Sequence, residues 1–105
     1  MSNNLIANKT TEEKGSVKLV LEGELTLANA SEIKNIFSES ANEYEKINIS
    51  LKNIKSIDLS FVQLLKSLKN NTLKNKKKLE IDYDLSQNIL ELLNNSGINL
   101  KKIIE

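Results

Sequence analysis

Residues 54–65 read Ile-Lys-Ser-Ile-Asp-Leu-Ser-Phe-Val-Gln-Leu-Leu and contain the end of one element and the start of the next. Apolar residues spaced three and four apart predict a helix from about Leu59 to Leu73. A strand ends before it, and a short loop carries Asp58 and Ser60. Either residue is a plausible N-cap, because a short oxygen-bearing side chain accepts an otherwise unpaired backbone N–H there. The residues expected to face the core are Phe61, Leu64, Leu65 and Leu68.

Toward the N-terminus the apolar pattern changes to period two. Alternating residues predict strands over Val17–Glu22 and Lys46–Leu51, and a weaker pattern predicts another over Leu5–Thr10. The polar segment between the strands over Leu5–Thr10 and Val17–Glu22 ends in Gly15, which is typical of the turn of an antiparallel hairpin. Residues 23–26 then break the strand pattern.

Helical spacing of apolar residues returns between the second and third strands. Ala30, Ile33, Phe37 and Ala41 predict a helix from Ala28 to about Asn42. Asn29 or Ser31 is the expected N-cap of this helix.

The C-terminal third repeats the alternation of strand and helix. Leu79, Ile81 and Tyr83 predict a strand that follows the lysine run 76–78. A helix is expected from Ser86 to about Asn95, with Gly97 as its C-terminal stop. The last apolar residues are candidates to close a remaining edge, with no place assigned to them; they are Ile98, Leu100, Ile103 and Ile104.

The order of elements predicts an α/β fold in a single domain, residues 1–105. Strands separated by helices of this length pair in parallel through crossovers, because a tight turn joins only antiparallel neighbours. We therefore expect a mixed sheet of about four strands, an N-terminal hairpin followed by parallel strands, packed against three or more helices.

Composition excludes several classes of site. The chain has no cysteine and no histidine, so thiol chemistry and the commonest general base and metal ligand are missing. A net charge of +1 and an aromatic content of 4% argue against nucleic-acid binding. No signal peptide and no apolar run of about 20 residues is present, so we expect a cytoplasmic protein without a membrane span. No cofactor is expected.

Two groups of residues are candidates for chemistry. Asp82 and Asp84 point to the same side of a strand, which makes a cation site conceivable, although a solvated strand end is the more ordinary interpretation. Ser60 is predicted at the start of a helix, a position that favours negative charge, and a phosphate on its hydroxyl would add a charge of about −1.5 to −2. The simpler interpretation of Asp58 or Ser60 is a helix cap worth about 1 kcal/mol.

The chain resembles the STAS domain family, the fold of bacterial anti-sigma factor antagonists, from Val17 through Ile98. The resemblance rests on Gly23-Glu24-Leu25 before the first helix and on the strand and loop over residues 47–54. Ile57-Asp58-Leu59-Ser60 before an apolar helix is similar to the family's Asp-Ser-Ser or Asp-Thr-Ser signature. The wording of residues 58–65 also resembles STAS proteins found with chemotaxis components.

The resemblance implies a phosphorylation switch. The family's serine at the position of Ser60 is phosphorylated by a partner serine kinase and anti-sigma factor with a histidine-kinase fold, and phosphorylation breaks the contact between them. The expected partner-binding residues are Asp58, Leu59, Phe61, Gln63 and Thr26. Thr26 stands where antagonists usually have an acid, and Phe61 where they usually have a small residue. Phe61 is interpreted either as core or as an exposed anchor.

Three functional hypotheses follow. The first is a non-catalytic regulatory module, a monomer or weak dimer, switched at Ser60 by a kinase-like protein partner. The second is a constitutive STAS subunit of a larger assembly, such as a lipid-transport ABC complex with its ATPase or a chemotaxis assembly. The third is an enzyme with Ser60 as nucleophile, which would need a lysine base because the chain has no histidine.

Overall fold

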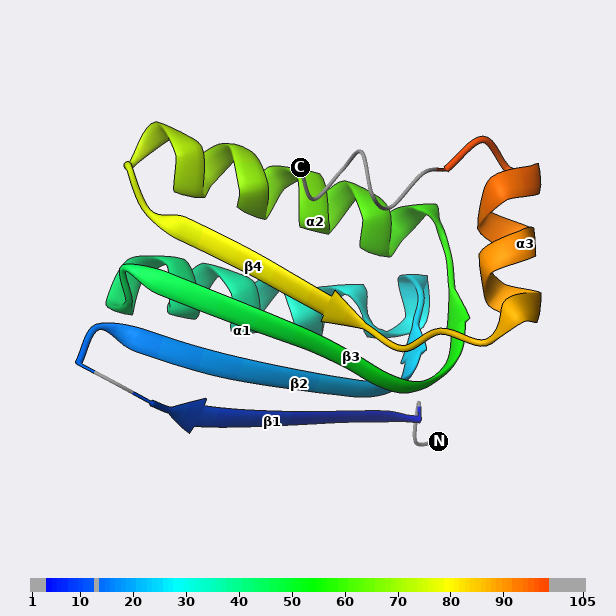
Figure 1. Cartoon of the computed structure of the whole chain (residues 1–105), viewed down its shortest axis with the longest axis horizontal. Helices are drawn as coiled ribbons and strands as arrows, with labels where there is room; N and C mark the ends of the chain where they lie inside the picture. The colour runs from blue at the N-terminus through cyan, green and yellow to red at the C-terminus, as the bar shows by residue number, and fades with distance from the viewer. Residues whose placement is uncertain (1–3, 13, 99–105) are drawn as a thin grey trace.

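In the computed structural model, residues 4–12 and 14–98 are described, and they form one sheet with helices on one face (Figure 1). The strands are β1 (Leu5–Thr11), β2 (Ser16–Leu25), β3 (Lys46–Ile57) and β4 (Lys78–Tyr83). The helices are the 3-10 turn η1 (Leu27–Asn29), then α1 (Ala30–Glu43), α2 (Leu59–Lys74) and α3 (Gln87–Asn95). Leu100, Ile103 and Ile104 lie outside the described residues.

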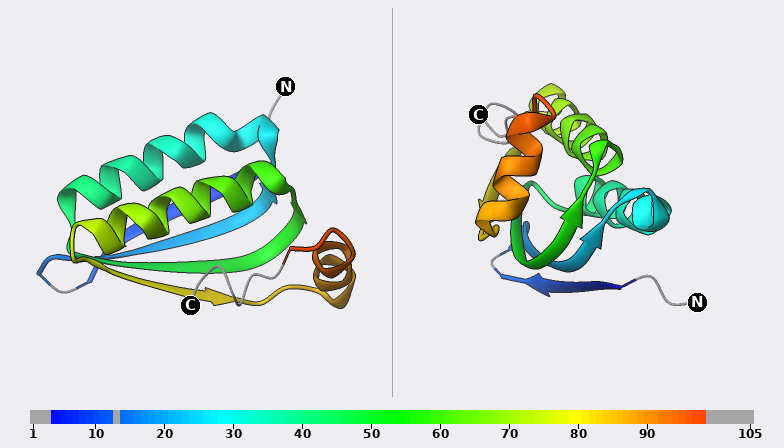
Figure 2. Two further views of the ribbon diagram at one scale, coloured as in Figure 1. Left: turned by 90° about the horizontal axis from the view of Figure 1, so that it is seen from above. Right: turned by 90° about the vertical axis from the view of Figure 1, so that its right-hand side faces the viewer.

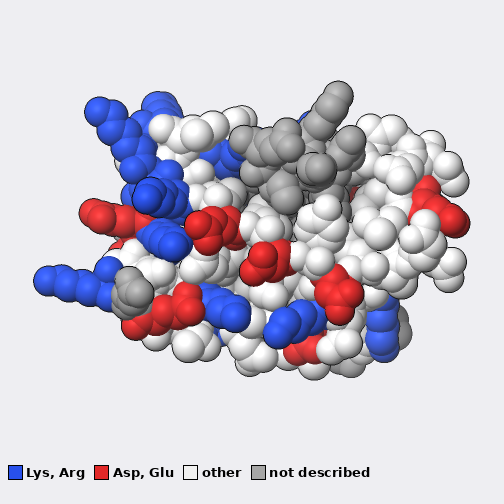
Figure 3. All heavy atoms as spheres, in the orientation of Figure 1, with Lys and Arg blue, Asp and Glu red and all other residues white. Residues whose placement is uncertain are grey.

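The sheet order is β1-β2-β3-β4, with β1 antiparallel to β2 and the remaining pairs parallel. This confirms the predicted hairpin followed by parallel strands. Helices α1 and α2 lie side by side on one face of the sheet (Figure 2). Helix α3 lies beyond the ends of β3 and β4 (Figure 1). Among the described residues, neither α1 nor α2 covers the opposite face of the sheet, where lysines and acidic residues are interspersed (Figure 3).

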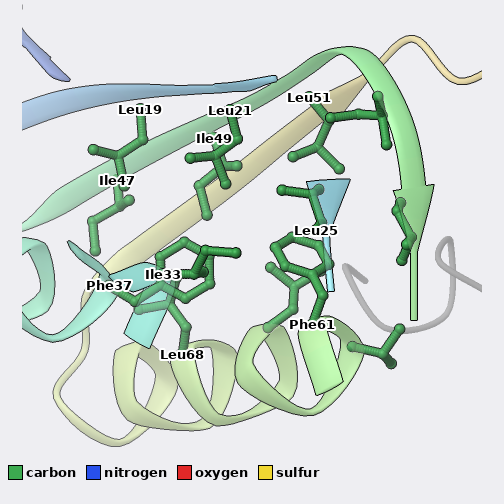
Figure 4. Packing of buried hydrophobic residues seen from close by; sticks show 14 of the residues in the cluster. Leu19, Leu21, Leu25, Ile33, Phe37, Ile47, Ile49, Leu51, Phe61 and Leu68 are labelled. Carbon is green, nitrogen blue, oxygen red and sulfur yellow. The ribbon is translucent and has the colours of Figure 1, made fainter. Parts of the chain in front are cut away.

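The core lies between the sheet and the two long helices. Inward residues of β2 and β3 pair across the parallel register, so that Leu19 lies opposite Ile49 and Leu21 opposite Leu51. Phe37 of α1 and Phe61 of α2 meet beneath them, with ring centroids 6.2 Å apart at a tilt of 58°. Figure 4 shows both rings packed among the aliphatic side chains. Such tilted aromatic pairs add to the burial energy of the individual rings.

Strands β2 and β3 both run further than the period-two pattern predicted. The expectation that residues 23–26 end the second strand was wrong, because β2 continues to Leu25 through a shift of register at Gly23. Gly23 has φ +99°, a backbone conformation that side chains rarely adopt. Strand β3 likewise continues past Asn53, at φ 48°, to Ile57, because Ile54 and Ile57 are still buried.

Two details of the helices also differ from expectation. Neither Asn29 nor Ser31 caps α1 through its side chain; the buried Asn29 side chain instead donates to the carbonyl of Glu24 at 2.8 Å. On α2, Val62 is fully buried while Leu64 is only partly buried, since the helix is rotated so that its inner face centres on Phe61 and Leu65.

Among the described residues, no helix has the length and apolar character needed to cross a membrane.

Candidate functional site

The carboxylate of Asp58 joins the start of α2 to the loop after β2. Its Oδ1 accepts the backbone N–H of Ser60 at 2.9 Å and that of Phe61 at 3.4 Å, which makes Asp58 the N-cap of α2. Its Oδ2 accepts the backbone N–H of Leu27 at 2.9 Å, and its own N–H donates to the carbonyl of Leu25. One side chain therefore fixes two loops that are far apart in sequence.

Ser60 lies inside the first turn of α2, whereas the sequence led us to expect it in the loop before the helix. Asp58 is the cap, so Ser60 is not needed for that role. The Ser60 residue is half-buried, and within residues 4–12 and 14–98 its hydroxyl forms no hydrogen bond. The hydroxyl is therefore available for a contact or a modification.

Two large apolar side chains are exposed at the start of α2 and in the loop that Asp58 binds to it. Leu27 is 72% exposed and Leu59 is 57% exposed. Gln63 is exposed one turn after Leu59 on the same helix. We call the group Thr26, Leu27, Leu59, Ser60 and Gln63 the α2-start surface. Large apolar side chains exposed in one region are a feature of protein-binding surfaces, so the start of α2 is a candidate interface.

Thr26 is the N-cap residue of η1, although its side chain makes no capping bond. Thr26 precedes the Leu27 N–H that binds Asp58, and its carbonyl accepts the N–H of Asn29 at 2.9 Å. The Asn29 side chain fixes the other side of the same loop. The loop is thus anchored on both sides of Leu27, which explains how a large apolar side chain is held out toward solvent.

Phe61 does not belong to the surface. Its side chain is 1% exposed and packs against Phe37, so the interpretation of Phe61 as an exposed anchor, and with it the prediction that it contacts a partner, was wrong. A ring at the third position of α2 points to the sheet because Leu65 and Leu68, one and two turns later, lie on the same inner face.

The other candidate groups have ordinary structural explanations. Asp82 and Asp84 are exposed at the end of β4, and among the described residues no three metal-binding side chains gather at one place. In the lysine run, the Lys77 ammonium donates to the Ala41 carbonyl at the end of α1. Lys46 and Glu80 form a surface ion pair across the neighbouring strands at 3.8 Å.

Comparison with known proteins identifies the fold. A family model described as "Mlab, STAS domain" matches residues 8–104. The chain belongs to the STAS domain family. This STAS domain is similar in structure to the anti-sigma factor antagonist SpoIIAA in its unphosphorylated form, with a TM-score of 0.70 and 17% identity over 89% of this chain and 82% of that chain.

Two further solved structures show the same architecture. The Bacillus cell fate determinant SpoIIAA in its phosphorylated form has a TM-score of 0.66 at 17% identity, over 89% of this chain and 85% of that one. An anti-sigma factor antagonist from Mycobacterium paratuberculosis has a TM-score of 0.75 at 12% identity, over 97% of this STAS domain and 84% of that chain. At identities this low the similarity shows the fold alone. No curated protein matches the chain.

Proposed function

We propose that this STAS domain is a regulatory protein-binding module that contacts its partner through the α2-start surface and is switched by phosphorylation of Ser60. The observation that carries the proposal is Ser60, a half-buried residue whose hydroxyl is free of hydrogen bonds to the described residues, in the first turn of α2 beside Leu59 in sequence and two residues after the Asp58 that binds the Leu27 loop. The structural similarity to anti-sigma factor antagonists supports a protein partner. The partner that fits this scheme is a serine kinase with a histidine-kinase fold.

A phosphate on Ser60 would act through Asp58. The Asp58 carboxylate already lies 2.9 Å from the backbone nitrogen of Ser60, so the phosphate places a second anion close to the first. A phosphoserine carries about −1.5 to −2 charge at neutral pH, and like charges in contact repel. The expected result is a weakened bond between Asp58 and the Leu27 N–H, together with an anion that cannot be desolvated in an apolar interface.

A second candidate is a constitutive STAS subunit that binds its partner through the same surface without phosphorylation. One observation favours it: the backbone N–H groups of Ser60 and Phe61 are already bound by Asp58, so a phosphate finds these donors occupied. An ATPase subunit of a transport complex or a component of a chemotaxis assembly would be the partner in that case.

We propose no catalytic role. The chain lacks histidine and cysteine, and within the described residues no lysine forms a hydrogen bond with Ser60 that would activate it as a nucleophile. Turnover by the wild type that is lost in Ser60→Ala, found in a broad panel of ester and amide substrates, would contradict this.

Phosphosite mapping of the protein isolated from its own cells separates the two candidates. We expect a phosphorylated fraction that maps to Ser60, disappears in Ser60→Ala and persists in the matched variant Ser67→Ala, which changes another serine of α2. Protein that carries no phosphate on Ser60 in any growth phase, while still binding its partner, would support the constitutive subunit instead.

A further inference from the structure

A groove runs between α1 and α2 on the side of these helices that faces away from the sheet. It contains a hollow of about 280 Å³. Its lining consists of four apolar and four polar residues, Phe37, Ala41, Leu64, Leu68, Lys34, Ser38, Ser67 and Asn71. Phe37, Ala41 and Leu68 are buried, whereas Lys34, Ser38, Ser67 and Asn71 are exposed. An apolar floor with a polar rim is the anatomy of a protein interface.

Within the described residues, the lining of the groove carries a single charge. In the part of the chain that the structure describes, Lys34 is the one charged residue of the lining, and it has no ion-pair partner there. Helix α2 contains three lysines and no acidic residue. Two of the three acids of α1 lie on its other flank, because Glu43 pairs with Lys9 of β1 at 3.4 Å and Glu39 lines a separate hollow against that strand. The one charged side chain that the described lining presents is therefore a cation, whereas the whole chain carries a net charge of only +1.

The groove is continuous with the α2-start surface. Leu64, Ser67 and Asn71 follow Ser60 at intervals of four, three and four residues, so all four lie on one flank of α2. Figure 2 shows that α1 and α2 run alongside each other for most of their length. A partner segment that covers Ser60 and continues in the same direction enters the groove.

We propose that the groove binds an acidic amphipathic helix of the protein partner, laid lengthwise between α1 and α2. The hollow receives apolar side chains from one face of that helix, at the i, i+3, i+4 and i+7 spacing usual for helices bound in grooves. A carboxylate beside this apolar face pairs with Lys34. The inference rests on the proposed protein-binding function and adds the chemistry of the partner.

The test is a selection followed by mapping. A phage-displayed library of helical peptides, randomised at surface positions, is selected on the unmodified protein. We expect enriched peptides with an apolar stripe flanked by Asp or Glu, which shift the amide resonances of Lys34, Ser38, Ser67 and Asn71. Lys34→Glu should lower the affinity of these peptides about tenfold, because like charges across an interface are unfavourable. The matched control Lys66→Glu changes an exposed lysine of α2 that is not part of the lining and should leave their affinity unchanged.

Several results would overturn the inference. They are a library that yields no binder, binders that are no more acidic than the starting library, and binders that map to other surfaces or respond equally to Lys34→Glu and Lys66→Glu. Because the selection uses unmodified protein, its outcome does not depend on phosphorylation of Ser60. The groove can therefore fail while the switch holds, and the switch can fail while the groove holds.

Discussion

The Asp58 carboxylate accepts the backbone N–H of Leu27 across 31 positions of sequence, at 2.9 Å, while it caps α2 with its other oxygen. This bond ties the backbone of the exposed Leu27 to the residue that precedes the exposed Leu59. The geometry of the α2-start surface therefore depends on the side chain of Asp58, whereas the proposed switch is Ser60.

Asp58→Ala should lower the free energy of unfolding by about 2–3 kcal/mol, because it removes the N-cap and leaves the Leu27 N–H without its partner. Urea denaturation measures this. Ser86 is the matched control, since it caps α3 through a single bond to the Ile89 N–H at 3.3 Å, and Ser86→Ala should cost about 0.5–1 kcal/mol. Equal losses in the two variants would show that the bond to Leu27 contributes nothing.

Leu68→Ala should cost about 2–5 kcal/mol by leaving a cavity under α2, because the side chain is 4% exposed. Leu64→Ala should cost less than about 2 kcal/mol, because Leu64 is only partly buried at the edge of the groove. The pair is compared by denaturant titration. A larger loss for Leu64 would mean that α2 is rotated relative to the arrangement in Figure 4.

Gly23→Ala should destabilise the protein by about 2–3 kcal/mol, because φ is +99° and an added β-carbon would clash with the Asn4 carbonyl oxygen. That oxygen accepts the N–H of Glu24, so we also expect faster hydrogen exchange at Glu24. Gly15→Ala serves as control; φ is +80° there, but no described residue lies within 4 Å of the added β-carbon, and the cost should be about 1 kcal/mol. Similar costs at both glycines would exclude the close approach of Asn4 as the reason for Gly23.

Lys76→Gly should stabilise the protein by about 0.5–1 kcal/mol. Lys76 follows the end of α2 at φ 57°, where a glycine relieves the strain of a side chain. Asn53, at φ 48°, is the comparison, since asparagine tolerates this conformation and Asn53→Gly should bring no gain. Thermal or denaturant unfolding distinguishes the two, and a destabilised Lys76→Gly would refute the explanation.

Much of the fold was predictable from the spacing of apolar residues. Period two located four strands, helical spacing located three helices, and the order of elements required the hairpin and the parallel pairs. The ends of β2 and β3 were missed because Gly23 and Asn53 interrupt the alternation while the strands continue on either side. In the sequence, a glycine or asparagine that adopts a positive φ within a continuing strand looks the same as one that ends the strand.

The candidate site was predictable only in part. Asp58 and Ser60 were found from their position before an apolar helix, but Leu27 was missed. Leu27 stands three residues before Ala30, so its spacing is that of the buried stripe of α1. Its exposure depends on the 3-10 turn η1 and on the bond to Asp58, which a local pattern does not contain. Conversely, Phe61 was open to two interpretations because the rotation of α2 decides which side its first turn buries.

The α2-start surface gives one more prediction. Replacing both exposed leucines, Leu27→Ser with Leu59→Ser, should leave the unfolding free energy within about 0.5 kcal/mol of wild type, because neither side chain is part of the core. The same double variant should lose its protein partner, because it removes the apolar anchors of the surface. A folded double variant that retains full binding would place the interface elsewhere.

The most direct measurement of the switch is quantitative affinity capture from the native lysate with four baits. The baits are the wild type, Ser60→Ala, the protein with phosphoserine incorporated at position 60, and the Leu27→Ser, Leu59→Ser double variant. We predict one partner that is retained by the wild type and by Ser60→Ala and lost from both other baits. Retention of that partner by the phosphoserine protein at the wild-type level would contradict the switch.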